Sequence, residues 1–358
     1  MKSESPPSSY CVEKTYWGEV DGKSVWLYKL SAKSGLQMNL TNYGAIVQSL
    51  FVPNKDGHYT DVVLGYDSLG EYIVDPFYLG AVVGRCTNRI AKGEVKIDNK
   101  NFQLSLTPGG FHQHGGHVGF NKKVWHAEPF INDNSIGITL TYTSPDGEEG
   151  YPGNLDVTLV YRLQEKKWSV DFLASTDQNT IINLTQHSYF NLGGHAKGSI
   201  VDHVMKSDAS MFLPATENLM PTGKIASVQG TPFDFLTDRK IGDHIDSKHA
   251  QLENSFGYDH FFVLEKVHSQ SLKKATTITD PLSARCMTVL TTEPGFHFYT
   301  GNFLTSSFKG KNGSMYEHRG GFCIETHHFP NAPNHANFPS IILKPGDQFK
   351  SRTEFIFD

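Results

Sequence analysis

Apolar and polar residues alternate along much of the chain, and this alternation predicts β-strands. Residues 157–163 alternate, four polar residues follow at 164–167, and residues 168–174 alternate again, which predicts a β-hairpin. Residues 136–143 alternate in the same way and lead into a loop rich in Pro and Gly at 144–153. Each of these alternating segments is therefore predicted to be a strand.

Further strand and turn signals extend over the rest of the chain. Residues 45–52 and 60–64 flank a turn, residues 95–104 predict a tight hairpin around Asp98 and Asn99, and residues 349–357 predict a last strand. Helical periodicity over about 11 residues is scarce, and neither a linker nor a fixed repeat is visible. We therefore predict an all-β fold, a large antiparallel β-sandwich in a single domain over residues 13–358, preceded by a disordered tail at residues 1–12.

Composition supports this interpretation and narrows the possible partners. The 33 Gly, 24 Phe and 15 Tyr among 358 residues fit many turns and strands. The net charge of −5 and the lack of a large Lys or Arg cluster argue against nucleic acid and anionic membranes as partners. We expect a small-molecule ligand and a protein that is a monomer or a weak homodimer.

The cysteines and the N-terminal residues bear on the cellular compartment. Cys11, Cys86, Cys286 and Cys323 lie far apart and form no C-x-x-C pair, so the sequence signals neither a zinc site nor a disulfide framework. The first residues lack the apolar stretch of a secretory signal, and no apolar run of about 18 residues occurs. We expect a cytoplasmic protein with reduced thiols.

Several familiar catalytic motifs are missing from the sequence. It contains no G-x-S-x-G, Walker A, G-x-G-x-x-G or H-E-x-x-H motif, which argues against serine-hydrolase and nucleotide chemistry. What remains are polar, glycine-rich segments that interrupt the strand pattern and carry side chains able to bind or protonate oxygen. They are residues 84–93, 111–117, 182–194, 256–262, 293–302 and 320–334. Such residue types favour a sugar ligand.

The first two segments supply hydrogen-bonding candidates. Asn88 and Arg89 are adjacent donors for hydroxyl or ring oxygens, although an isolated arginine is more often a surface or structural cation. His112, His114 and His117 are spaced closely enough to suggest a metal site, and the glycines that follow allow close backbone approach to a ligand. Because no carboxylate or thiolate is nearby, we favour hydrogen-bonding histidines over metal ligands.

The remaining segments supply acid–base candidates. His187, flanked by aromatic and amide residues, can donate or accept a proton near neutral pH. Asp259 stands just before a predicted strand, where it would either bind two sugar hydroxyls or serve as a turn residue. Glu325 ends an apolar run, so partial desolvation would raise its pKa and make it a usable base, unless it is a salt-bridged core residue. The aromatic residues of 293–302 could form a stacking face for a sugar ring.

Taken in order, these segments resemble those of the aldose 1-epimerase family, also called galactose mutarotases. The resemblance extends from about residue 17 to residue 357 and is carried by several motifs together. They are Asn88-Arg89-Ile90-Ala91-Lys92-Gly93, His114-Gly115-Gly116, His187-Ser188-Tyr189-Phe190-Asn191-Leu192, Tyr258-Asp259-His260, Phe298-Tyr299-Thr300-Gly301-Asn302 and Glu325-Thr326.

The resemblance implies a β-sandwich with an open sugar cleft and assigns roles to residues. It implies that Glu325 is the catalytic base and His187 the acid, and that the sugar is bound by Asn88, Arg89, His114 and Asp259. Interconversion of anomers requires removal of the C1 hydroxyl proton and protonation of the ring oxygen, followed by rotation and reclosure. One carboxylate and one imidazole suffice for this, so we expect no cofactor and no metal.

Two positions depart from the usual pattern of the family, and two other functions stay open. His297 and His327 stand where the family often carries glutamine. We expect His297 to belong to the substrate-binding residues and to influence which sugar epimers are accepted. The alternatives to a mutarotase of free hexoses are a mutarotase of phosphosugars and a sugar-binding module without activity. A phosphosugar would need more cations at the cleft rim than Arg85 and Arg89, the two that are obvious in these segments.

Overall fold

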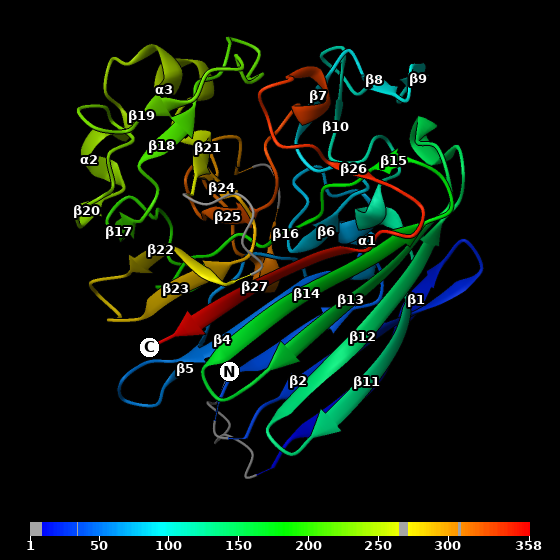
Figure 1. Cartoon of the computed structure of the whole chain (residues 1–358). Helices are drawn as coiled ribbons and strands as arrows, with labels where there is room; N and C mark the ends of the chain where they lie inside the picture. The colour runs from blue at the N-terminus through cyan, green and yellow to red at the C-terminus, as the bar shows by residue number, and fades with distance from the viewer. Residues whose placement is uncertain (1–8, 34, 265–270, 307–308) are drawn as a thin grey trace.

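The computed structural model describes residues 9–33, 35–264, 271–306 and 309–358 (Figure 1). Strands make up 45% of the chain and helices 8%. The three α-helices of the described residues are short, at Leu69–Ile73 (α1), Gly242–Ile245 (α2) and Ala250–Ser255 (α3). None of the helices in these ranges is long and apolar enough to cross a membrane. The prediction of an all-β fold is confirmed.

A five-stranded antiparallel sheet forms one layer of the sandwich. Its strands follow one another in sequence order, so each pairs with the next along the chain. They are β1 (Cys11–Val20), β2 (Lys23–Ser31), β3 (Gln37–Thr41), β4 (Val47–Pro53) and β5 (Tyr59–Asp61). Because β1 begins at Cys11, residues 11 and 12 belong to this sheet and not to the tail predicted from the sequence. Residues 1–8 of that tail lie outside the described residues.

A nine-stranded antiparallel sheet forms the facing layer. In spatial order its strands are β11 (His126–Asn132), β12 (Ser135–Ser144), β13 (Leu155–Leu163), β14 (Lys167–Thr176), β27 (Phe349–Phe357), β23 (Cys286–Thr291), β22 (Lys273–Thr279), β17 (Val204–Ser207) and β20 (Arg239–Lys240). The hairpin predicted over residues 157–174 is therefore confirmed as β13 and β14. The C-terminal strand β27 lies in the middle of the sheet, between β14 and β23 (Figure 1).

The main core lies between these two sheets. Alternate residues of β13, including Leu155, Leu159 and Tyr161, are buried, and they belong to one cluster with Leu40 and Val47 of the opposite sheet. The Tyr161 hydroxyl also donates a hydrogen bond of 2.9 Å to the carbonyl oxygen of Ala45, which ties the layers together. Period-two alternation in the sequence thus reflects one buried and one more exposed face.

A second five-stranded sheet carries several of the candidate residues. Its spatial order is β19 (Ala226–Ser227), β18 (Met211–Leu213), β21 (Asp259–Val263), β24 (Gly295–Tyr299) and β25 (Cys323–Thr326). Four two-stranded pairs complete the assignment. They are β6 (Ala81–Val83) with β16 (Thr185–His187), β7 (Arg89–Ala91) with β10 (Phe111–Gln113), β8 (Glu94–Ile97) with β9 (Lys100–Gln103), and β15 (Thr180–Ile181) with β26 (Ile342–Leu343).

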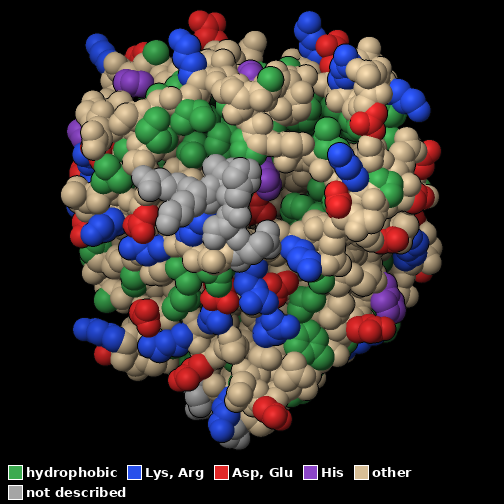
Figure 2. All heavy atoms as spheres, viewed as in Figure 1, with side chains coloured by type: hydrophobic (Ala, Val, Ile, Leu, Met, Phe, Trp, Pro, Cys, Tyr) green, Lys and Arg blue, Asp and Glu red, His purple; other side chains and the backbone are tan. Residues whose placement is uncertain are grey.

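Charged side chains are mixed over the surface. On the face shown in Figure 2, Lys and Arg side chains are interspersed with Asp and Glu. This distribution agrees with the small net charge of −5. The four cysteines are all free thiols, two of them buried.

Candidate active site

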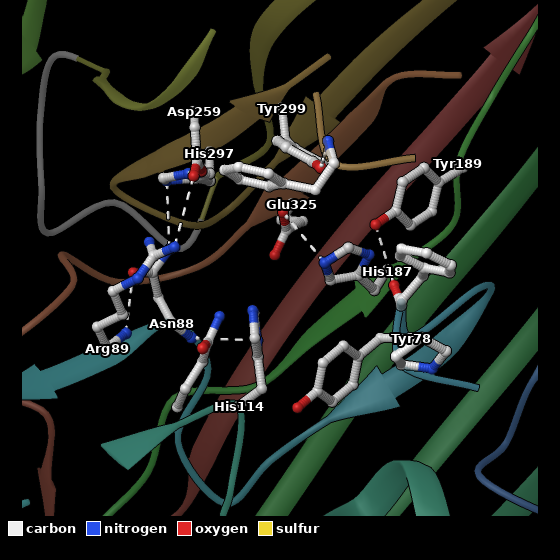
Figure 3. A pocket seen from close by; sticks show the side chains of 14 residues that line it. Tyr78, Asn88, Arg89, His114, His187, Tyr189, Asp259, His297, Tyr299 and Glu325 are labelled. Atoms are coloured by element: carbon white, nitrogen blue, oxygen red, sulfur yellow. Dashed lines mark hydrogen bonds and ion pairs between the residues drawn. The ribbon is translucent and has the colours of Figure 1, made fainter. Parts of the chain in front are cut away.

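One polar pocket collects residues from all six of the predicted segments (Figure 3). Its volume is about 180 Å³, and 14 side chains line it. The lining residues are Pro76, Phe77, Tyr78, Asn88, Arg89, Gln113, His114, His187, Tyr189, Asp259, His297, Tyr299, Phe303 and Glu325. All seven residues selected from the sequence as catalytic or substrate-binding are among them.

Glu325 and His187 form a buried pair in this pocket. Oε1 of Glu325 lies 3.5 Å from Nε2 of His187, and the two residues are only 2% and 4% exposed. The second carboxyl oxygen, Oε2, is buried and has no hydrogen-bond partner among the described residues. Within the site this oxygen is therefore an unused acceptor for a ligand hydroxyl.

Burial sets the protonation of the pair. It raises the pKa of the Glu325 carboxyl well above its ordinary value, an effect that the charge of Asp259 increases and that of Arg89 opposes. Burial also lowers the pKa of His187 to about 4. Burial therefore favours the neutral form of each group, with the proton on the Glu325 carboxyl and the His187 imidazole uncharged.

His114 completes the acid–base end of the pocket. Its Nδ1 accepts a hydrogen bond of 3.4 Å from the backbone N–H of Asn88, so the neutral ring carries its proton on Nε2. Burial, together with the nearby His187, lowers the pKa of His114 well below its ordinary value and keeps the ring neutral. The Nε2 atom points toward Glu325 (Figure 3) and is thus a hydrogen-bond donor for a ligand.

The same end of the pocket has the residue types of a metal site. His114, His187 and Glu325 each present one potential ligand atom, and these atoms lie within 4.8 Å of one another. The cluster suggested by the sequence, His112 with His114 and His117, is not the one that forms, since of those three only His114 lines the pocket. His112 is instead held between the carbonyl oxygen of Ser105 and the hydroxyl of Tyr151.

A charged network occupies the opposite end. Nε2 of His297 lies 2.5 Å from Oδ1 of Asp259, and the Arg89 guanidinium lies 3.5 Å from Oδ2. The other nitrogen of His297, Nδ1, lies 3.3 Å from the amide of Asn88. Burial alone would raise the pKa of the Asp259 carboxyl, but Arg89 and His297 outweigh it and hold that pKa below the ordinary value. Asp259 is therefore a fixed anion.

His297 and His327, the two departures from the family pattern, are neighbours in the structure. His297 lines the pocket, whereas His327 is fully buried outside it. The two rings are stacked, with centroids 6.1 Å apart and planes 19° apart. His327 therefore supports His297 and does not face the pocket.

The glycine after His114 has a different role from the one predicted. A Cβ atom at Gly115 would lie 1.8 Å from the carbonyl oxygen of Gly84, and the backbone φ of +88° also favours glycine. The close approach expected toward a ligand is thus an approach between two backbone segments. It places the loop that bears Asn88 and Arg89 beside His114.

Sequence reasoning missed two aromatic residues of the pocket, Tyr78 and Phe303, although Tyr299 of the predicted aromatic segment 293–302 lines it. Tyr78 packs against His114 and His187, with ring centroids 4.8 and 6.0 Å away, and Phe303 forms part of the rim. Backbone φ values of 59°, 61° and 50° at Tyr78, Asn88 and His114 are rare for residues other than glycine, and such strain often marks functional sites. The turn Asp75-Pro76-Phe77-Tyr78 was a visible signal, but nothing in it indicated which segments would meet.

Arg85, which the sequence placed among the available cations, is not part of the pocket. Its guanidinium is buried and donates hydrogen bonds to the carbonyl oxygens of Ser144, Pro145 and Pro152. Arg85 therefore anchors the loop at residues 144–153. Arg89 is the single Lys or Arg among the described residues that line the pocket.

Comparisons with known proteins agree with this fold. The model of the aldose 1-epimerase family matches residues 27–355. A galactose mutarotase from Sus scrofa is 40% identical over 347 residues, 97% of this chain and 98% of that protein. An aldose 1-epimerase from Escherichia coli (strain K12) is 32% identical over 340 residues, 94% of this chain and 96% of that protein.

A solved structure shows the same architecture. The crystal structure of a galactose 1-epimerase from Lactobacillus acidophilus matches with a TM-score of 0.87 and 28% identity, covering 98% of this chain and 99% of that one. These matches, over nearly the whole of an antiparallel β-sandwich, show that the chain is an enzyme. It belongs to the aldose 1-epimerase family.

Proposed function

We propose that this enzyme interconverts the α and β anomers of free aldohexoses such as D-glucose and D-galactose. The observation that carries the proposal is the buried pair of Glu325 and His187, with 3.5 Å between carboxyl oxygen and imidazole nitrogen, in a pocket lined by polar side chains that can hydrogen-bond a sugar. In this proposal Glu325 is the base and His187 the acid. The names of the similar proteins support the reaction class.

Ring opening uses the two groups together. The Glu325 carboxylate takes the proton of the C1 hydroxyl while the His187 imidazolium protonates the ring oxygen, and the C1–O5 bond breaks to give the free aldehyde. After rotation about C1–C2, the same two groups return the protons in the opposite sense and the ring closes as the other anomer. No proton is gained or lost overall.

The resting protonation is compatible with this cycle. The neutral pair carries the same single proton as the carboxylate–imidazolium pair that begins ring opening. Transfer of this proton from Glu325 to His187 across the 3.5 Å gap is therefore sufficient to create the reactive form. The C1 hydroxyl of a bound sugar favours the transfer, because it donates a hydrogen bond to the new carboxylate.

The other polar residues hold the sugar in this proposal. Asp259 accepts hydrogen bonds from hydroxyl groups, while Arg89, Asn88 and the Nε2 atom of His114 donate them. His297 lies between Asn88 and Asp259 and so connects the two sides of the binding network. The aromatic residues Tyr78 and Phe303 offer apolar surface to the faces of the ring.

Two alternative functions are less well supported. A phosphosugar substrate would call for several cations, but Arg89 is the single one among the described lining residues and already contacts Asp259. A binding module without activity would have no need for a buried acid–base pair. Polarimetry with freshly dissolved α-D-glucose and α-D-galactose tests the proposal. Binding of either sugar without acceleration above the buffer rate would contradict it.

We also propose that residues 11–358, which include all of β1, act as one catalytic domain, in the cytoplasm, as a monomer or weak homodimer. The family match over residues 27–355 supports a single domain. Four free thiols, two of them buried, fit a reducing compartment. Sedimentation of the full chain at several concentrations distinguishes a monomer from a weak dimer.

A further inference from the structure

Gln113 lines the pocket next to Arg89. The two residues are direct partners in the antiparallel pair formed by β10 and β7. Side chains of directly opposed residues project from the same face of such a pair. The side chains of Gln113 and Arg89 therefore extend side by side.

The neighbours of Gln113 in β10 confirm which way its side chain extends. His112 projects from the opposite face of the strand, where its ring is fully buried and hydrogen-bonded. Phe111 shares the face of Gln113, and the central guanidinium carbon of Arg89 lies 5.8 Å from the centroid of the Phe111 ring. The face of β10 that carries Phe111 and Gln113 is thus the face beside Arg89.

The side-chain amide of Gln113 is half-buried and has no hydrogen-bond partner within the described ranges of the chain. The other amide of the pocket, that of Asn88, is engaged at both ends. Its oxygen accepts a hydrogen bond of 2.9 Å from the backbone N–H of Arg89, and its nitrogen lies 3.3 Å from Nδ1 of His297. Because a shielded polar group without a partner costs free energy, the Gln113 amide favours a ligand that satisfies it.

We propose that Gln113 binds a hydroxyl group of the sugar and helps to determine which pattern of hydroxyl groups the enzyme accepts. This inference rests on the proposed function. Because the C1 hydroxyl and the ring oxygen then meet Glu325 and His187, the opposite end of the pocket, at Arg89, meets the rest of the sugar (Figure 3). The hydroxyl bound by Gln113 is therefore one at C2, C3, C4 or C6.

An amide suits a hydroxyl group better than the charged groups beside it do. The Arg89 guanidinium can only donate hydrogen bonds, and the Asp259 carboxylate can only accept them. Gln113 presents an acceptor oxygen and a donor nitrogen together, and a hydroxyl both donates and accepts. A sugar that lacks this hydroxyl leaves the amide unpaired again, which is how a polar site discriminates between similar substrates.

Deoxy sugars identify the hydroxyl. Gln113→Met keeps the length of the side chain and removes both hydrogen-bonding groups. We expect kcat/KM for D-galactose to fall about five- to tenfold, the equivalent of one hydrogen bond, and mainly through KM, since the contact is present in ground and transition states. Among the 2-, 3-, 4- and 6-deoxy derivatives of D-galactose, the one without the bound hydroxyl should react equally well with the wild type and with Gln113→Met.

A second glutamine supplies the matched control. Gln37 is also half-buried in a strand, β3, but does not line the pocket. Gln37→Met should therefore leave kcat/KM unchanged for every sugar. Circular dichroism and thermal unfolding show whether Gln113→Met is folded, and Gln113→Ala, which removes the same two groups, takes its place if it is not.

Two results would overturn the proposal. An unchanged kcat/KM for D-galactose in a folded Gln113→Met would show that the amide does not contact the sugar. A loss by the same factor for D-galactose and for all four deoxy derivatives would show that Gln113 acts on the protein, for example on the buried and unpartnered Nε atom of Arg89.

Equilibrium binding separates this inference from the proposed function. Dissociation constants for the same five sugars, measured by ligand-observed NMR, should show the same pattern. Gln113→Met should bind D-galactose about five- to tenfold more weakly than the wild type does, and one deoxy derivative equally well. If the wild type bound sugars without accelerating mutarotation, the proposed function would fail, while the dissociation constants would still decide whether Gln113 holds a hydroxyl.

Discussion

The imidazole of His187 and the carboxyl group of Glu325 face each other across 3.5 Å although they come from separate sheets, β16 paired with β6 and β25 paired with β24. Burial shifts the two pKa values in opposite directions, upward for Glu325 and downward to about 4 for His187. In the proposed mechanism, the proton that ring opening needs is therefore already held by the pair, on the carboxyl side.

Removing either member of the pair should abolish most turnover. We expect Glu325→Gln and His187→Gln to lower kcat by roughly 10² to 10⁴-fold each with modest change in sugar affinity, because both groups act chiefly in the transition state. The double variant should be little worse than the worse single variant. Glu293→Gln, which changes a buried carboxyl outside the pocket, is the matched control and should stay active. Near-normal polarimetric rates for Glu325→Gln would mean that another group is the base.

The pH dependence of kcat/KM should be bell-shaped. As pH falls, the single-proton pair gains a second proton on His187, whose pKa is lowered to about 4, and Glu325 can no longer become ionised. As pH rises through the raised pKa of Glu325, the pair loses its last proton and no acid remains. An ordinary histidine titrates at about pH 6.5. Activity should therefore persist at pH values well below that. An acid limb near pH 6.5 in initial-rate polarimetry would contradict this order of pKa values.

Replacing the residues assigned to sugar binding should affect KM. Arg89→Lys and Asp259→Asn leave the acid–base pair intact but weaken contacts that are present in both ground and transition states. KM should therefore rise at least as much as kcat falls. Initial rates over a range of galactose and glucose concentrations give both parameters. A pure kcat effect in either variant would assign that residue to the chemical step.

His297 should influence the choice between epimers. In His297→Gln the side-chain amide can still donate to Asp259 and accept from Asn88, so activity should persist, but a different shape then faces the sugar. We expect the ratio of kcat/KM for glucose to that for galactose to change. His327→Gln is the control, because that ring lies behind His297 and does not line the pocket. An unchanged ratio in His297→Gln would show that this residue does not contact the sugar.

Activity should survive removal of metal ions. His114, His187 and Glu325 have the geometry to approach an ion, yet in the proposed mechanism their lone pairs and protons serve the sugar directly. Exhaustive dialysis against a chelator, followed by polarimetry in metal-free buffer, should leave kcat unchanged. Loss of activity that a divalent ion restores would instead assign these three residues to a metal centre.

Much of the fold was predictable because the long strands bury one face. The alternation in β13, β14 and β12 leaves a period-two signal in the sequence, and β27 was predicted with the bounds observed. The pocket strands are harder to identify. β16 and β25 are short and buried throughout, so no alternation marks them.

Residues that meet in the pocket were predictable where their chemistry is distinctive, as for His187, Asp259 and Glu325. Tyr78 and Phe303 were missed because aromatic residues are common in any β core, and only the three-dimensional path of the chain brings these two to the pocket. Arg85 was misjudged because its neighbours in sequence face the pocket, whereas its own side chain turns to the loop at residues 144–153.

The central position of β27 has a consequence for the synthesis of the protein. Residues 349–357 follow every other described strand in the sequence, yet they fill the gap between β14 and β23. Until these residues have left the ribosome, both neighbouring strands expose unpaired backbone groups, which are templates for association with other chains. A nascent chain stalled before residue 349 should therefore depend on chaperones. Pairing of β27 with β14 and β23 should then remove the exposed strand edges and reduce association with other chains.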